Sequence, residues 1–148
     1  QPILDSVTFG PVPACAGRAG AVFDDDVGSP ALVQCTDAYA ACVPAPADCG
    51  AYALSARFSL LHELAHVWLI QNVDDGTQAA FLEVFGITTW DDRQVPWHRR
   101  GVEHGAEVVA WGLLDEVVPL ERIDDPPCEQ LAEAWGTLTS TGAPHDCG

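Results

Sequence analysis

The chain contains near its centre the segment FSLLHELAHVWLI, which runs from Phe58 to Ile70. Turn-forming residues follow it between Asn72 and Gly76, so the segment predicts a helix over residues 51–72. Nearly every side chain in it is apolar, which is typical of a helix that is buried on all sides. We therefore expect this helix to lie at the centre of the fold.

Three ionisable side chains interrupt the apolar segment: His62, Glu63 and His66. Positions i and i+4 lie one turn apart on one face of a helix, so two imidazoles there can bind one metal ion at about 2.0–2.1 Å each. Glu63 lies about 100° around the helix, where it can act as general base on a metal-activated water. With five His and eight Glu in the chain, chance predicts only about 0.007 HExxH matches.

An alternative is that His62 and His66 are hydrogen-bonded groups of the core. Burying two imidazoles and a carboxylate without partners costs several kcal/mol in total. A bound metal ion removes that cost, because it coordinates the neutral rings directly. The buried helix therefore favours the metal site over the alternative.

A catalytic zinc usually has three protein ligands and a water, so a third ligand is expected downstream. Glu103 and Glu107 are again four residues apart, and Ala106 and Val109 supply an apolar flank for burial. Two carboxylates on a partly buried stripe need a cation or proton donors. The simplest assignment makes Glu103 the ligand and lets Glu107 accept a hydrogen bond from the far N–H of a ligand His. The reverse assignment and an exposed pair of Glu on a solvated face remain alternatives.

The sequence HELAH at residues 62–66, followed by EHGAE at residues 103–107, resembles the gluzincin zinc metallopeptidases. In that group a downstream helix supplies a Glu ligand, and an acidic residue four positions later orients a ligand His. Many members have Asp at that later position, where this chain has Glu. The resemblance covers two helices and implies a minimal, single-domain, zincin-like fold with one catalytic Zn²⁺. It implies these roles: His62, His66 and Glu103 bind zinc, Glu63 is the general base, and Glu107 lies behind a ligand His.

The group stabilising the oxyanion is not placed by any motif. Three of the six Arg residues fall between residues 93 and 100, close in the chain to Glu103. A cation near the metal stabilises a developing oxyanion, so His98, Arg99 or Arg100 is expected in a catalytic role. Tyr39 and Tyr52 are alternatives. Two Trp residues are equally compatible with a substrate groove and with the core: Trp90 and Trp97.

The order of the expected elements predicts one α+β domain over residues 1–148 that is mainly helical. Residues 1–50, rich in Pro, Gly, Ala and Cys, predict a small irregular β-sheet tied by disulfides. The candidate strands are Ile3–Phe9, Ala21–Phe23 and Ala31–Gln34. Residues 51–148 form the helical region with the metal site. Its further expected helices are 77–85 with Gly86 as the stop, 101–118 closed by Pro119, and 128–138.

Six Cys residues in an acidic chain without Met predict disulfides and an oxidising compartment. We expect local pairs: Cys15 with Cys35, Cys42 with Cys49, and Cys128 with Cys147. Reduced, buried Cys is the alternative. We therefore expect a secreted protein from which a signal peptide has been removed. Asp24, Asp25 and Asp26 are candidate Ca²⁺ ligands, although such a run is more often a solvated turn.

The formal net charge is -16, with 22 acidic residues against six Arg and no Lys. Such a surface disfavours binding to nucleic acid and to anionic membranes, and it favours a monomer. The expected function is hydrolysis of peptide bonds in a peptide or protein substrate by a secreted zinc metallopeptidase. One alternative is a zinc-stabilised extracellular binding or structural module without turnover, in which His98 or His104 is a fourth ligand. Another is an amidase acting on a non-protein amide such as cell-wall material.

Overall fold

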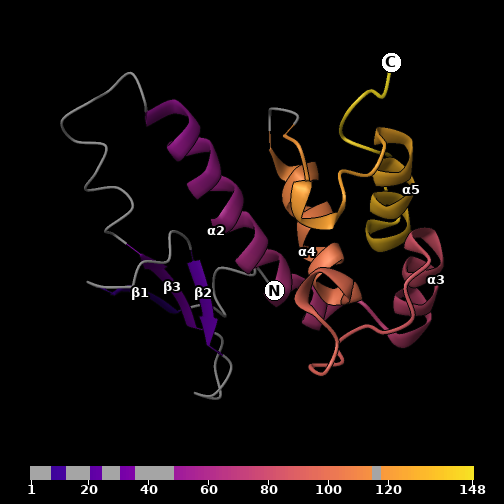
Figure 1. The fold of residues 1–148 in the computed structure, drawn as a ribbon, viewed down its shortest axis with the longest axis horizontal. Coiled ribbons are helices and arrows are strands. Elements are labelled where there is room, and N and C mark those ends of the chain that lie inside the picture. The colour runs from indigo at the N-terminus through magenta and orange to yellow at the C-terminus, as the bar shows by residue number, and fades with distance from the viewer. Residues whose placement is uncertain (1–7, 13–20, 25–30, 36–48, 115–117) are drawn as a thin grey trace.

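The computed structural model describes residues 8–12, 21–24, 31–35, 49–114 and 118–148. Side chains are described from Arg57 onward, except those of residues 115–117 and Glu121. This part of the chain is mainly helical (Figure 1). Its α-helices are α2 (Cys49–Asn72), α3 (Asp75–Phe85), α4 (Gly101–Leu113) and α5 (Cys128–Thr139). Two short 3₁₀ helices are η2 (Trp97–Arg99) and η3 (Glu121–Ile123).

Three strands precede the helices: β1 (Thr8–Val12), β2 (Ala21–Asp24) and β3 (Ala31–Cys35). Their order in the sheet is β1-β3-β2, with β1 parallel and β2 antiparallel to β3. Pro11 lies in the edge strand β1, where the missing N–H of proline is tolerated. Both β2 and β3 contact α2.

Helix α4 lies between α2 on one side and α5 on the other (Figure 1). The core that joins the helices is centred on Ala65 and Leu69 of α2 and on Ala106 and Trp111 of α4, all at most 2% exposed. Residues 103–112 of α4 are buried without exception. Three glycines let neighbours approach α4 closely: Gly101, Gly105 and Gly112. The close approach of α2 and α4 is what places the ionisable groups of both helices side by side.

Helix ends follow the local signals in the sequence. The Asp74 carboxylate accepts the N–H of Thr77 at 2.8 Å and so caps α3. Gly86 ends α3 with a left-handed φ of 63°, as its position after the apolar run predicts. The predicted helices at 77–85 and 128–138 correspond to α3 and α5 with small differences at their ends.

Two expectations about the helices are wrong. The third helix ends at Leu113, not at residue 118, because Leu114 turns to extended backbone with φ -83° and ψ 146° and is itself buried. Pro119 disfavours helical backbone at Val118 as well. Helix α2 is not buried on all sides either: Ile70 is 70% exposed. Leu61, Leu64 and Trp68 on α2 line an apolar hollow of about 340 Å³.

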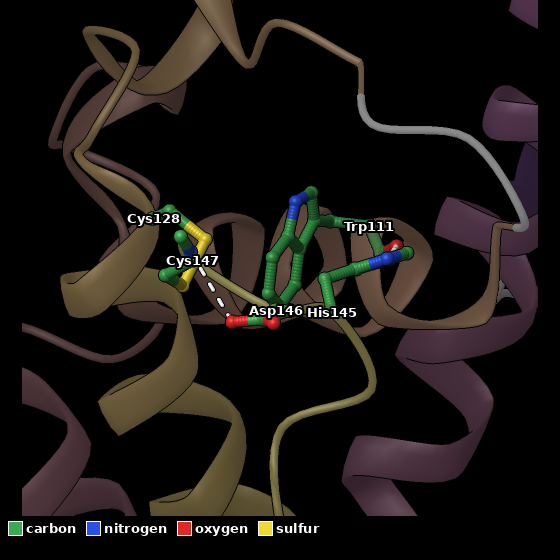
Figure 2. Close-up of a disulfide and its surroundings, with 6 residues drawn as sticks. Trp111, Cys128, His145, Asp146 and Cys147 are labelled. Atoms are coloured by element: carbon green, nitrogen blue, oxygen red, sulfur yellow. Dashed lines mark hydrogen bonds between the residues drawn. A yellow bond between two sulfur atoms is a disulfide. The ribbon is translucent and has the colours of Figure 1, made fainter.

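A disulfide joins Cys128, at the start of α5, to Cys147, as predicted (Figure 2). The other two predicted pairs lie outside the described side chains. The tail before Cys147 is anchored as well, because the His145 Nε2–H donates to the carbonyl oxygen of Trp111 at 2.9 Å. The two rings meet edge to face with centroids 4.6 Å apart (Figure 2). The disulfide and this contact together hold the C-terminal segment against α5 and α4. No described helix is long and apolar enough to cross a lipid bilayer.

Candidate metal centre

Two histidines of α2 form one side of the site. His62 and His66 are four residues apart, so the helix places their rings one turn apart on the same face. Their Nε2 atoms are 3.1 Å apart, and their ring planes stand at 87° to each other. His62 is 3% exposed, and the His66 side chain is 13% exposed. Both rings therefore direct Nε2 toward a common point that bulk solvent barely reaches.

Helix α4 supplies a carboxylate to the same point. The Glu103 Oε2 atom lies 3.4 Å from His62 Nε2 and 3.2 Å from His66 Nε2. These three residues form the one buried group with the spacing of a metal site in the part of the chain that the structure describes. We call His62, His66 and Glu103 the triad.

The donor atoms of the triad are spaced as a metal ion requires. Ligands in tetrahedral geometry with bonds of about 2.0–2.1 Å are separated from one another by about 3.3 Å. The separations in the triad are 3.1, 3.2 and 3.4 Å. Glu103 Oε2 is buried and has no hydrogen bond of good geometry to any described group, although both imidazoles are near. A cation at the centre of the triangle would satisfy all three atoms at once.

Glu107 lies behind the triad. Its Oε1 atom is 3.2 Å from Nδ1 of His62, and the residue is 1% exposed. Since a carboxylate only accepts, it favours the tautomer with the proton on Nδ1, which leaves the Nε2 lone pair of His62 facing the triad centre. Glu103 faces the Nε2 atoms and Glu107 faces Nδ1, as the simplest assignment predicts. The alternative of an exposed Glu pair is wrong, because both residues are buried.

The electrostatics of the metal-free chain favour a positive charge in the triad. Burial by itself would lower the pKa of His62, but the close approach of the Glu103 and Glu107 carboxylates outweighs burial and raises that pKa to about 9. Burial would raise the pKa of Glu103, but the two imidazoles outweigh it and lower the pKa to about 2. The site therefore holds a proton where it has no metal ion, and a divalent cation would compete for the same place.

Glu63 is the next residue of α2 after His62 and is half-buried. Burial raises its pKa above the ordinary value of 4.5, and the charges of His62 and His66 oppose that rise. A carboxylate with a raised pKa is a stronger base at neutral pH. Glu63 therefore combines nearness to the triad with the basicity that general-base chemistry needs.

Trp97, which the sequence offers as a groove candidate, and Arg122, which no sequence pattern marks, lie together beside the triad. The Trp97 ring stacks on His62, with centroids 5.8 Å apart and planes at 25°. The guanidinium carbon of Arg122 lies 5.9 Å from the Trp97 centroid, and Arg122 Nη1 is 3.8 Å from Glu107 Oε1. Arg122 lies 15 residues beyond Glu107 in the chain, and no motif marks it, so only the packing of η3 against η2 reveals it.

His98 and Arg99 line a different hollow, of about 870 Å³, together with His104. No described contact joins their side chains to the triad, so their expected role on substrate stays a prediction. The side chain of Arg100 is engaged elsewhere: it donates to the carbonyl oxygens of Val95 and Arg93. His104 Nε2–H donates to the His98 carbonyl at 2.9 Å, and burial lowers the His104 pKa despite this contact.

The other expected site residues are either part of the core or lie outside the described side chains. Trp90 packs edge-on against Phe81 in the core. The side chains of the remaining candidates lie outside the described ones: Tyr39, Tyr52, Asp24, Asp25 and Asp26. Comparison of the chain with protein-family models, with curated proteins and with solved structures gave no match. The geometry of the site is therefore what indicates a function for this chain.

Proposed function

We propose that the chain is a zinc-dependent metallopeptidase that acts outside the cell on peptide or protein substrates. In this proposal the strands and helices make up one α+β, zincin-like domain that disulfides stabilise. The observation that supports it most directly is the triangle of three buried donor atoms, 3.1–3.4 Å apart, contributed by α2 and α4. Two imidazoles and one carboxylate are the ligand set of many catalytic zinc sites, which keep one position for water.

The residues divide the work as follows. Zinc in the triad would supply a Lewis acid that polarises a carbonyl and lowers the pKa of water. Glu107 holds His62 in the ligating tautomer. Glu63 takes the proton from the attacking water and then gives it to the leaving amine. The stacked ring of Trp97 covers one face of His62 and restricts the access of bulk water to that ligand.

The competing proposal of a structural zinc site requires a fourth protein ligand. Within the described residues the candidate metal-binding group contains only the three members of the triad. His104, one candidate for a fourth ligand, is hydrogen-bonded through Nε2 to the His98 carbonyl oxygen. This arrangement favours a site with an open position. An amidase acting on a non-protein substrate shares the same ligands, so the choice of substrate in the experiment decides that question.

The decisive variant is Glu63→Gln, which keeps the size of the side chain and removes its basicity. We expect near-stoichiometric zinc in both proteins and a fall in kcat of about 10²–10⁴-fold on a peptide library. Zinc is measured by elemental analysis and cleavage by mass spectrometry. Glu133→Gln on the exposed part of α5 is the matched control and should cleave like the parent.

Two results would contradict the proposal. If the parent protein binds no zinc after preparation without chelators, the metal site is wrong. If Glu63→Gln cleaves peptides at the parent rate, the general base is wrong. Zinc binding without cleavage of any peptide, but with cleavage of a non-protein amide, would replace the peptidase by the amidase.

A further inference from the structure

Arg122 brings a positive charge to the edge of the candidate metal centre. It lies in η3, which packs against η2, and its guanidinium lies over the Trp97 ring. Trp97 in turn stacks on the triad member His62. The same guanidinium faces Glu107, which contacts the other side of the His62 ring. Arg122 is therefore two contacts away from a proposed metal ligand by two independent routes.

These contacts leave the N–H donors of the Arg122 guanidinium available for a further ligand. Its side chain is 56% exposed, and the 3.8 Å to Glu107 is too long for a hydrogen bond. Among the described residues it makes no hydrogen bond, in contrast to Arg100, whose guanidinium donates to two backbone carbonyls. Arg122 and Trp97 line an open hollow of about 330 Å³. The hollow therefore has an aromatic side and a cation with free donors.

The positive charge of Arg122 offsets an excess of negative charge at the candidate metal centre. Three carboxylates belong to the candidate metal centre: Glu103 within the triad, and Glu63 and Glu107 beside it. Together they exceed the charge of a divalent ion by one negative unit, which would repel an anionic ligand in a chain whose net charge is already -16. Arg122 brings the local sum to zero.

We propose that Arg122, held over Trp97, binds a carboxylate of the substrate next to the scissile amide. The planar guanidinium fits a carboxylate through two parallel hydrogen bonds. The inference rests on the proposed peptidase function and names its substrate class: peptides with a carboxylate beside the cleaved bond. That carboxylate is either the free C-terminus or the side chain of Asp or Glu.

The test measures binding in the zinc-loaded full chain carrying Glu63→Gln, so that no turnover is needed. The first pair of probes is N-acetyl-trialanine as the free acid and as the C-terminal amide. The second pair is a longer peptide, blocked at both ends, with Glu or Gln at its centre. We expect the carboxylate member of at least one pair to bind about tenfold more tightly by calorimetry. Preference in the first pair identifies the C-terminus, and preference in the second identifies an acidic side chain.

Arg122→Gln in the same background should abolish this preference, and Arg122→Lys should retain part of it. Arg93→Gln changes the net charge equally at an exposed loop position and should keep the full preference. A carboxylate can also bind the metal ion itself, so a preference that is unchanged in Arg122→Gln overturns the proposal. So does loss of the preference in Arg99→Gln alone, which would give the role to the cation expected from the sequence.

Two readouts separate this inference from its alternatives. Zinc affinity should be unchanged in Arg122→Gln; a fall in zinc affinity with an intact preference means that Arg122 acts through Glu107 and contradicts carboxylate binding. The peptidase proposal fails separately, if the parent chain binds these probes with the expected preference but cleaves no peptide. Equal kcat/KM within both substrate pairs, free acid against amide and Glu against Gln, would leave the peptidase standing and overturn the carboxylate site.

Discussion

His62 is the central residue of the candidate metal centre, because its two ring nitrogens face two different carboxylates. Its Nδ1 faces Glu107 and its Nε2 faces Glu103, at 3.2 and 3.4 Å. A ring held between two buried carboxylates binds a cation on Nε2 only if Nδ1 keeps its proton, which the Glu107 carboxylate ensures. Glu107 is therefore expected to contribute to metal binding through His62 although it does not face the triad centre.

Glu107→Gln tests that dependence. The amide carbonyl still accepts from Nδ1, but the negative charge that strengthens the ligand is lost. We expect zinc affinity to fall by about 10–100-fold, measured by competition with a chromophoric chelator. Glu83→Gln, on the exposed part of α3, is the control. Equal affinities in the two variants would mean that Glu107 does not support His62.

The raised pKa of His62 predicts how zinc binding depends on pH. Metal binding must displace the proton that the metal-free site holds up to a pKa of about 9. The apparent affinity for zinc should therefore rise about tenfold per pH unit between pH 6.5 and 8.5. Release of about one proton per zinc, measured by calorimetry in buffers of different ionisation enthalpy, is the companion observation. An affinity that does not change over this range would contradict it.

The same pKa values predict the stability of the metal-free chain. The folded pKa of His62 lies above the ordinary value of 6.5, so its contribution is complete below pH 6.5 and is lost as the pH rises through about 9. The folded pKa of Glu103 lies below 4.5, so its contribution is complete above pH 4.5 and is lost as the pH falls toward about 2. For these two groups the metal-free chain is most stable between about pH 4.5 and 6.5.

At the level of the elements, the glycines of α4 control how closely its neighbours pack. A methyl group on Gly112 would overlap the Trp135 ring of α5, and one on Gly105 would come within 3.1 Å of Leu69 on α2. On both faces of α4, side chains of the neighbouring helices therefore pack directly against the α4 backbone. The position of Glu103 relative to α2 depends on this close packing, since the triad joins the two helices.

Gly112→Ala should therefore destabilise the protein, although alanine is the better helix former. We expect a loss of about 1–3 kcal/mol from overpacking against Trp135, measured by urea unfolding of the zinc-loaded protein. Gly136→Ala, within α5, is the control: its methyl group meets nothing closer than 3.6 Å, so we expect a gain of up to about 1 kcal/mol. A neutral Gly112→Ala would mean that α5 is free to move away.

At the level of the whole molecule, the Cys128–Cys147 disulfide and the candidate metal centre lie in separate parts of the fold. The disulfide joins two residues that are 19 positions apart near the C-terminal end of the chain. The triad joins α2 and α4 without residues from that segment. The two features should therefore fail independently when either is removed.

The Cys128→Ala/Cys147→Ala variant tests this independence. Loss of a loop closure of this length should cost about 3 kcal/mol and lower the Tm by roughly 10 °C. Zinc stoichiometry and affinity at 20 °C should stay at parent values. A variant that is folded by circular dichroism but has lost zinc would show that the C-terminal segment supports the site.

The local features of this chain are determined by its sequence. The spacing of His62 and His66 places their rings on one helix face wherever the helix lies, because the period of 3.6 residues is a property of the backbone. Gly86 ends α3 because a left-handed residue is easiest for glycine. Such features depend on neighbours in sequence, and the identities of the residues suffice to predict them.

Packing between distant segments decided the rest. Glu103 faces the Nε2 atoms and Glu107 faces Nδ1 because of how α4 turns against α2, and the sequence left both orders open. Arg122 reaches the site only because η3 packs against η2. The sequence predicted a longer α4 and a fully buried α2; both expectations are wrong because packing between distant segments decides where a helix ends and which face is covered. Contacts across tens of residues depend on shape complementarity over the whole core, which no local pattern in the chain records.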